Sequence, residues 1–327
     1  MSPKSPTVVA LSGAHVLVTG ANGFVGPHLA RSLVARGARV SGAGLGAAPP
    51  THDLEEWTTV DLADRPGLDQ LLRARPPRVV VHLAGQSSAA HSFVAPLETF
   101  EANVLGTWNL LDAVSHAAPT ARVIVVGTSE VYGSITPGTR ADENHPMRPV
   151  SPYALSKSVV DTTAAAFGLA SRLDVVRARP FGHAGPGQTA RFMLPGFAEQ
   201  IAAIECGRAE RVLRVGNLEV TRDLTDVRDI AEGYCALIER GRSGEVYNLC
   251  RGTGVVLSQL AASLASMAKV DVRIQVDPAR LRPADVPYLV GDPTRAGRDV
   301  GWAATITFES TLRDVLQEWR GLASGQG

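Results

Sequence analysis

The sequence predicts an α/β protein built on a Rossmann-type, doubly wound parallel sheet, with a smaller C-terminal α/β lobe. Two observations predict the sheet. Short apolar runs of strand length alternate with longer segments of helical period up to Pro180, and a glycine-rich turn follows the first apolar run. Strands separated by helices of this length form right-handed βαβ units, so we expect their sheet to be parallel. The lobe is predicted because this rhythm changes after Pro180, where Gly and Pro become dense.

The elements of the predicted sheet domain follow in chain order. In the first helix, Leu29, Leu33 and Val34 fall on one face, as helical spacing requires. The expected strands are His15–Thr19, one that begins at Ala38–Val40, Trp57–Val60, Val79–Leu83, Arg122–Gly127 and Leu173–Ala178. The expected helices are Phe24–Arg36, Leu68–Ala74, Leu97–Ala117 and Pro152–Leu169.

The chain is expected to divide into two domains. A Rossmann domain spans residues 13–180, and about 226–249 returns to it, with a helix over Asp226–Arg240 and a strand over Val246–Leu249. Residues 181–225 and 250–320 make up most of the smaller lobe, with helices at Phe197–Cys206 and Leu257–Ala268 and a strand at Val212–Val215.

Composition narrows the classes of function. The 327 residues are 45% hydrophobic and 20% charged, so the chain can bury a sizeable core. Lys+Arg and Asp+Glu both number 32, and this balance argues against nucleic acid as a partner. The three cysteines form no CxxC pair or metal-ligand cluster, so no metal is expected. No apolar run is long enough for a membrane span and no signal-peptide core is seen, so we expect a cytoplasmic protein.

The glycine-rich turn predicts a dinucleotide site. Its GxxGxxG pattern lies between the first strand and the first helix, where backbone N–H groups can approach a pyrophosphate. Pro27 follows the third glycine and is tolerated in a first helical turn. The candidate cofactor-binding residues of this turn are Gly20, Asn22, Gly23, Phe24, Val25 and Gly26.

The end of the second strand leaves the choice of cofactor open. An acidic residue there holds the ribose of NAD, whereas Arg accommodates the extra phosphate of NADP. The segment from Val40 to Leu45 offers neither. Because no acid opposes the phosphate, we lean slightly to NADP(H) over NAD(H).

Tyr153 and Lys157 form a candidate catalytic pair. Four residues apart on a helix, their side chains lie on one face. A free tyrosine has a pKa of about 10, and a nearby ammonium together with a positive nicotinamide ring would favour the phenolate. Tyr153 is therefore expected to exchange a proton with a substrate oxygen while a hydride moves.

The setting of this pair resembles the extended short-chain dehydrogenase/reductases. The string SPYALSK lies downstream of GTSEVYG, which ends the preceding strand. The resemblance implies that Thr128 completes a catalytic group with Tyr153 and Lys157. It also implies that Glu130 contacts the sugar in reductases or acts as a base in dehydratases, and that Ser129 lies beside the substrate.

The same resemblance extends to the segment after the fourth strand, HLAGQSS. It implies that Ser87 contacts a sugar and that Asn103 supports the geometry of the site. Further cofactor contacts implied by the resemblance are Asp61, Leu62, Leu83, Ala84, Gly85 and Pro180.

The C-terminal half resembles the GDP-6-deoxy-D-mannose reductases and the GDP-mannose 4,6-dehydratases. The strings that carry the resemblance are GPGQ from Gly185, VGNLEVTRDLTDVRD from Val215 and RLRPADVP from Arg280. They imply a nucleotide-diphosphate sugar as the partner, with GDP favoured. His183 is a further candidate substrate-binding residue, and Arg222 and Arg282 are candidates to hold the diphosphate. The family usually has Asn at the position of Gly182. Because that Asn would contact the sugar or its diphosphate, Gly182 leaves the identity of the sugar and of the base open.

The expected reaction is NAD(P)H-dependent reduction of the C4 keto group of a nucleotide-linked 4-keto-6-deoxyhexose. Thr128 and Glu130 also supply the groups that elimination needs, so a 4,6-dehydratase or a 4-epimerase is an alternative. A non-catalytic nucleotide-binding protein is a second alternative, disfavoured because Tyr153 and Lys157 are both present. The resemblance further implies a homodimer, formed through the helices near 97–117 and 152–169.

Overall fold

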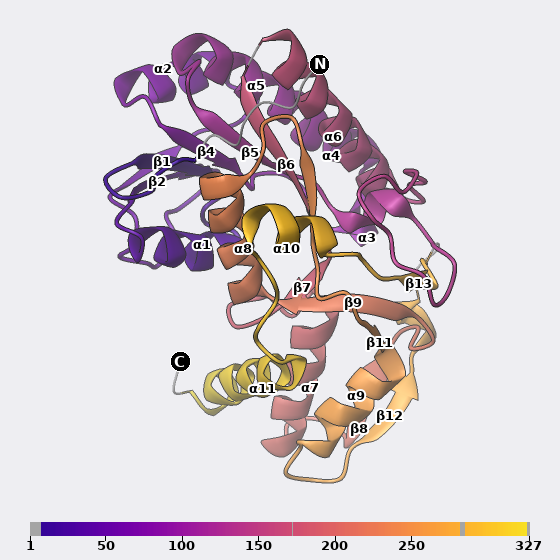
Figure 1. Ribbon diagram of the computed structural model, residues 1–327. Coiled ribbons are helices and arrows are strands. Elements are labelled where there is room, and N and C mark those ends of the chain that lie inside the picture. The colour runs from indigo at the N-terminus through magenta and orange to yellow at the C-terminus, as the bar shows by residue number, and fades with distance from the viewer. Residues whose placement is uncertain (1–7, 172, 282–284, 326–327) are drawn as a thin grey trace.

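A seven-stranded, fully parallel sheet forms the centre of the protein in the computed structural model, which describes residues 8–171, 173–281 and 285–325 (Figure 1). Its strand order is β10-β6-β5-β4-β1-β2-β3. The strands are β1 (His15–Thr19), β2 (Arg39–Gly44), β3 (Glu56–Thr59), β4 (Val79–His82), β5 (Arg122–Val126), β6 (Asp174–Pro180) and β10 (Val246–Leu249). The predicted fold class is confirmed.

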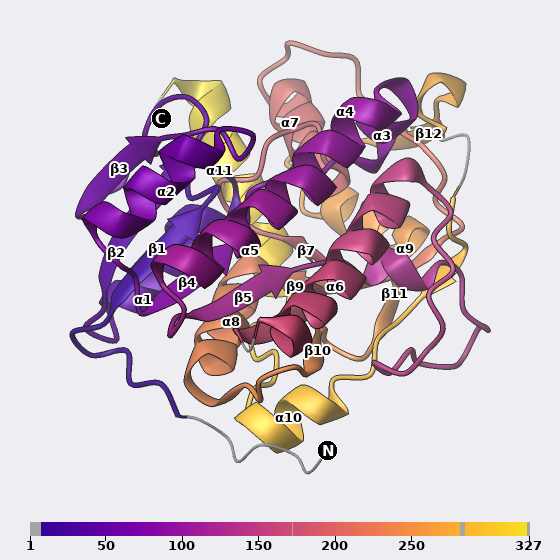
Figure 2. The same ribbon diagram turned by 90° about the horizontal axis from the view of Figure 1, so that it is seen from above.

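Helices cover both faces of the sheet because side chains alternate along each strand. Val16 and Val18 of β1 pack into one buried cluster, and Leu17 between them packs into the other. The first face is covered by α1 (Val25–Val34), α8 (Val227–Arg240) and α10 (Thr294–Val300). The second is covered by α2 (Arg65–Ala74), α5 (Gly106–Ala117) and α6 (Pro152–Ala170), and Figure 2 shows α5 and α6 side by side.

The helix predicted over Leu97–Ala117 is interrupted, which corrects the prediction. It consists of α4 (Pro96–Phe100), a π-helical turn η1 (Glu101–Leu105) and α5, with the short α3 (Ala89–Val94) before it. In the π-turn, the Asn103 carbonyl accepts a hydrogen bond from Thr107 Oγ1 at 2.6 Å. The π-turn spans only five residues, too few for a change of apolar period to be recognised, so the pattern did not reveal the interruption.

The smaller lobe lies below the sheet in Figure 1. Its core joins α7 (Met193–Glu205), α9 (Leu257–Ser266) and α11 (Phe308–Ser324) with β8 (Val212–Val215). The remaining lobe elements are β7 (Gly182–Ala184), β9 (Thr221–Asp226), β11 (Gly254–Val256), β12 (Arg273–Val276), η3 (Pro278–Arg280) and β13 (Tyr288–Leu289). α7 begins one turn earlier than expected, at Met193 rather than Phe197.

Two carboxylates anchor the crossings between the sheet and the lobe. Asp223 accepts backbone N–H groups from Arg251, Gly252 and Gly291 at 2.9–3.2 Å. Asp229 accepts from Thr305 and from the Ile306 N–H. The α10 segment thus packs on the sheet domain and α11 packs on α7 of the lobe. The domain boundaries given above stay a prediction.

Candidate active site

A cavity of about 1330 Å³ lies where the carboxyl ends of the parallel strands face the lobe. Strand β1 with the glycine-rich turn, β4, β5 with the 3-10 turn η2 (Ser129–Tyr132), and the start of α6 line one side. The lobe lines the other. Pockets for one small ligand measure about 300–1,000 Å³, so this cavity has room for more than one.

The glycine-rich turn is a close-fitting cradle. Gly20 has φ +70°, and a Cβ there would lie 2.6 Å from the Ala84 backbone nitrogen. A Cβ on Gly26 would clash with the Ala21 backbone. Only glycine fits at these positions, and the turn opens α1, whose free N–H groups favour phosphate. The residues therefore fit a dinucleotide.

Tyr153 and Lys157 are brought together by the first turn of α6. The Ser151 side chain caps that helix by accepting the Ala154 N–H at 3.1 Å. Lys157 Nζ donates to the Val126 carbonyl at the end of β5, at 3.1 Å. Burial lowers the pKa of Lys157 to about 8. The pair thus faces the cavity from a fixed helix start.

The phenol of Tyr153 is protonated in the protein alone. Burial, and then the negative charge of Glu130, raise the pKa of Tyr153, while a hydrogen bond with Thr128 opposes them. This balance holds for the protein without a nicotinamide ring, so the expectation that Lys157 and that ring together favour the phenolate stays a prediction. Tyr153 is poised to donate a proton.

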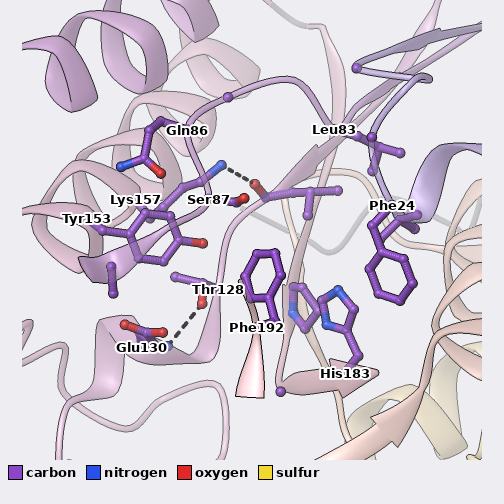
Figure 3. A pocket seen from close by; sticks show the side chains of 18 of the residues that line it. Phe24, Leu83, Gln86, Ser87, Thr128, Glu130, Tyr153, Lys157, His183 and Phe192 are labelled. Atoms are coloured by element: carbon purple, nitrogen blue, oxygen red, sulfur yellow. Dashed lines mark hydrogen bonds between the residues drawn. The ribbon is translucent and has the colours of Figure 1, made fainter. Parts of the chain in front are cut away.

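Thr128 and Glu130 flank the phenol. Thr128 caps η2 by accepting the Glu130 N–H at 3.2 Å, so the same short turn fixes both residues. Figure 3 shows Thr128 between the phenol of Tyr153 and the Glu130 carboxylate, with Ser87 near the ammonium end of Lys157 and Gln86 on the far side of Lys157 from the phenol. The four predicted catalytic residues thus share one wall of the cavity.

Asn103 ties the loop after β4 to α6, the helix that carries Tyr153 and Lys157. Its Oδ1 accepts the Gln86 N–H at 2.8 Å, and its Nδ2 donates to the Gln86 carbonyl at 3.1 Å and to Ser156 Oγ at 2.9 Å. Ser156 lies between Tyr153 and Lys157 in the chain. The π-turn carries Asn103, and π-turns in helices are frequent at functional sites.

A second buried link joins the end of β1, just before the glycine-rich turn, to α5. His82 contacts Thr19 Oγ1 at 2.8 Å and Thr107 Oγ1 at 3.0 Å. Burial, with the Lys157 charge, lowers the pKa of His82 to about 3, so the imidazole is neutral. No local pattern predicted a role for His82, because its partners are 25 and 63 residues away.

A buried network sets η2 against α6 and β6. Arg179 donates to both carboxylate oxygens of Asp161, and its Nη1 donates to Tyr132 OH at 2.9 Å. Tyr132, the last residue of η2, donates to Asn248 Oδ1 at 2.7 Å, and burial raises its pKa to about 12. Arg177 also pairs with Asp161, but its Nη2 donates to the Gly244 carbonyl. Only Arg179 of these two arginines reaches η2.

The lobe closes the other side of the cavity with aromatic rings. His183 stacks on Phe24 of the glycine-rich turn, with ring centroids 6.0 Å apart and planes 6° apart. Its Nδ1 lies 2.9 Å from the Phe181 carbonyl, and burial lowers its pKa. Figure 3 shows Phe192 beside these rings, opposite Tyr153. The turn and the lobe are therefore in direct contact.

Arg222 pairs with Asp285, at 2.9 Å, and not with its chain neighbour Asp223. The guanidinium also donates to the Thr221 and Val286 carbonyls. The Arg222 guanidinium lines the cavity, so it is placed to bind a diphosphate, although the Asp285 carboxylate partly neutralises its positive charge. Arg282 lies outside the described residues.

Comparison with known proteins identifies the family. The model for GDP-mannose 4,6 dehydratase matches residues 17–315. The chain belongs to this family. GDP-6-deoxy-D-mannose reductase from Pseudomonas aeruginosa is 35% identical over 93% of this chain and 96% of its own.

Two solved structures share the fold. RMD from Pseudomonas aeruginosa, complexed with NADPH, has a TM-score of 0.82 and 32% identity over 94% of this chain and 99% of its own. UDP-glucose 4-epimerase from Thermus thermophilus, complexed with NAD, has a TM-score of 0.85 and 29% identity over the same shares. The resemblance to extended short-chain dehydrogenase/reductases and to GDP-6-deoxy-D-mannose reductase is confirmed.

The cavity collects the predicted site residues of this family member, apart from Arg282. Lining it are Gly20, Asn22, Gly23, Phe24, Val25, Gly26, Asp61, Leu62, Leu83, Ala84, Gly85, Ser87, Thr128, Ser129, Glu130, Tyr153, Lys157, Pro180, His183 and Arg222. Lining residues that the sequence did not single out include Gln86, Phe192, Met193, Asn217 and Arg280. The HLAGQSS string pointed to Gln86, but no local signal marked Phe192.

We expect Arg179→Met to cost more stability than Arg177→Met. Removing Arg179 leaves Asp161 Oδ2 buried without its partner, and losing one member of a buried pair costs about 3–5 kcal/mol. Arg177→Met leaves both bonds between Arg179 and Asp161 in place, so the loss should be smaller. Urea denaturation measures both, and hydrogen exchange should show weaker protection of residues 129–132 only in Arg179→Met. If both variants lose the same stability and residues 129–132 keep their protection from exchange, Arg179 does not hold η2 in place.

Proposed function

We propose that the protein is an NAD(P)H-dependent reductase of the C4 keto group of a nucleotide-linked 4-keto-6-deoxyhexose, with GDP-4-keto-6-deoxy-D-mannose as substrate and GDP-D-rhamnose as product. One observation carries the proposal. A protonated Tyr153 lies beside Thr128 and Lys157 on the wall of a cavity large enough for a dinucleotide and a sugar nucleotide. The similarity to GDP-6-deoxy-D-mannose reductase supports the choice of sugar.

The proposed roles follow from the placement of each residue. The bound reduced cofactor would supply the hydride. Tyr153 donates its phenolic proton to the C4 oxygen, and the Thr128 hydroxyl holds that oxygen in line. Lys157, charged below its pKa of about 8, bonds the nicotinamide ribose. Glu130 and Ser87 orient the hexose from either side of the phenol.

The similarity to GDP-6-deoxy-D-mannose reductase supports reduction over the alternatives, and the protonated phenol of Tyr153 is compatible with it. A reductase needs the phenol protonated at the start, whereas a dehydratase or epimerase begins by removing a proton from the C4 hydroxyl. One observation favours a dehydratase as second candidate: Glu130 sits beside the phenol, where a base for elimination is needed. The family name also agrees with that activity.

The sugar nucleotide is proposed to bind between the catalytic wall and the lobe. Arg222 holds the diphosphate, His183 contacts it from the stack on Phe24, and α7 and β8 frame the base. Gly182 lines the cavity where a Cβ would lie 2.8 Å from Leu224 Cδ2, so no larger side chain fits without a shift.

Among the helices of the described residues, none combines the length and the apolar character that a membrane span requires. The cytoplasmic location stays a prediction.

The decisive experiment compares two substrates. Incubated with GDP-4-keto-6-deoxymannose, the protein should consume reduced cofactor in step with product. Turnover of GDP-mannose without net cofactor consumption would instead identify a dehydratase. Tyr153→Phe should lower turnover about 10²–10⁴-fold, the usual contribution of a general acid, while cofactor binding stays unchanged. An active Tyr153→Phe enzyme would refute the role of the phenol.

The rate should fall on the alkaline side with an apparent pKa near 8. Lys157 loses its charge as pH rises through its pKa of about 8, and with it the charge-assisted bond to the ribose. Because kcat/KM for the cofactor reports groups of the free enzyme, a pH profile of that constant measures the limb. Arginine stays charged in this pH range, so in Lys157→Arg kcat/KM should no longer fall near pH 8, although its maximal value should be lower than in the wild-type protein. If kcat/KM of this variant still falls near pH 8, another group causes the fall.

We also propose a homodimer through α4–α5 and α6. Exposed apolar side chains gather there, and Trp108, 52% exposed, packs edge-on against Phe167. The other large apolar residues of this face are Leu97, Leu105, Leu155 and Leu169. Trp108→Glu should halve the mass measured by light scattering, while Leu322→Glu, an equally exposed leucine on α11, should not. A monomeric wild-type protein would disprove the dimer.

A further inference from the structure

The GPGQ string at residues 185–188 forms a loop directly after β7, and the peptide at its centre is held from two sides. We propose that His28 and Glu318 are positioning residues. They hold the Pro186–Gly187 peptide between α1 and α11, and thereby fix the lobe side of the cavity relative to the glycine-rich turn. The inference rests on the proposed function, since it concerns how the two ligands of that reaction meet.

His28 reaches the peptide from the sheet domain. It lies near the start of α1, close behind the glycine-rich turn. Its Nε2 is 2.8 Å from the Pro186 carbonyl oxygen, and because a carbonyl can only accept, Nε2 carries the proton in this bond. The imidazole also packs edge-on against Phe24, with ring centroids 5.9 Å apart. His28 thus connects the loop to the helix that begins at the dinucleotide cradle.

Glu318 reaches the same peptide from the lobe. It is carried by α11, which packs against α7 (Figure 1). Its two carboxylate oxygens are 2.9 and 3.0 Å from the Gly187 nitrogen, whose N–H they accept. In a trans peptide the C=O and the N–H point in opposite directions. One peptide group therefore links the sheet domain, through its carbonyl, with the lobe, through its N–H.

The two bonds are expected to strengthen each other. A carboxylate acceptor makes the bond to the Gly187 N–H charge-assisted, and hydrogen bonds at the two ends of one peptide polarise it cooperatively. Neither side chain lines the cavity, and nor do Pro186 and Gly187, all of which lie in the described part of the chain. His28 and Glu318 therefore act on bound ligands through the loop and not by contact.

The residues on both flanks of this peptide belong to the cavity wall. His183 before it and Gln188 after it line the cavity, and Gln188 Nε2 donates to the His183 carbonyl at 3.3 Å. His183 stacks on Phe24, and Phe192 follows at the start of α7, opposite Tyr153 (Figure 3). A shift of the held peptide would displace this wall relative to the catalytic residues.

Reaction geometry makes this separation important. The cofactor cradle belongs to the sheet domain, whereas the sugar nucleotide is proposed to bind against the lobe. Hydride transfer needs the reacting atoms about 3–3.5 Å apart, and a misplacement of about 1 Å can cost about a hundredfold in rate. Loss of either bond should therefore slow the complex of both ligands, while each ligand keeps its own contacts.

Kinetics and calorimetry test the proposal together. His28→Leu removes the donor and Glu318→Leu removes the acceptor, and neither adds a charge. Each should lower kcat for GDP-4-keto-6-deoxymannose by about tenfold to a hundredfold. The dissociation constants of GDP and of the reduced cofactor, each measured alone, should stay within about twofold of the wild-type values.

Conservative variants and neighbouring controls separate positioning from a general loss of stability. His28→Gln keeps a donor and Glu318→Gln keeps an acceptor, so both should retain most of the rate that the leucine variants lose. Arg31→Leu, further along α1, and Gln317→Leu, the exposed neighbour of Glu318, should leave kcat within about twofold of the wild-type value. Because both bonds hold one peptide, the double leucine variant should lose clearly less than the product of the two single losses.

Hydrogen exchange reports on the loop without turnover. Amides of residues 187–192 should exchange faster in both leucine variants than in the wild-type protein, Arg31→Leu or Gln317→Leu. Unchanged exchange in both leucine variants would overturn the proposal, and so would a fall in kcat that is matched by an equal loss of ligand binding. A wild-type protein that reduces no 4-keto sugar would refute the proposed function instead, and the exchange rates would still show whether the two residues hold the loop.

Discussion

The buried ion pair between Asp161 and Arg179 joins elements that the chain brings in from four directions. Asp161 is one helical turn beyond Lys157, and Arg179 lies at the end of β6, where β10 pairs alongside. Through Tyr132 the pair reaches the turn that carries Glu130, and through Tyr132 and Asn248 it reaches β10. Taking two charges out of water is costly, and the cost is offset here because each remaining polar edge of Arg179 finds an oxygen. The separation of the Glu130 carboxylate and the Tyr153 phenol therefore depends on buried groups that line no part of the cavity.

Around this pair, the protonation states form a consistent set. Burial keeps His82 neutral and Tyr153 protonated, while Lys157 titrates just above neutrality. A neutral imidazole next to the Lys157 ammonium avoids a second positive charge in the same buried region. The resting site thus holds the Lys157 ammonium, the Glu130 carboxylate and one donor proton on Tyr153, which suits the delivery of a proton to a carbonyl oxygen.

Local patterns in the sequence predicted the sheet, the glycine-rich turn and the Tyr–Lys pair, because each depends on residues a few positions apart. The π-turn that carries Asn103 was not predictable in this way, since it spans only five residues and the side-chain partners of Asn103, Gln86 and Ser156, lie on other parts of the fold. Arg222 was predicted to hold a diphosphate, and its ion-pair partner Asp285, which lies 63 residues away, was not predicted. Phe192 faces Tyr153 only because the lobe folds back over the sheet. Residues that act through long-range contacts leave no local trace.

The smaller lobe enters and leaves the sheet domain more than once, and this limits how such proteins can be recombined. Its core draws on the segments of α7, α9 and α11, which are separated by α8, β10 and α10. A chimaera that imports another lobe must therefore match several junctions at once, where Asp223 and Asp229 collect backbone N–H groups from distant segments. Substituting single side chains within the lobe is therefore a simpler way to change the sugar specificity than replacing the whole lobe.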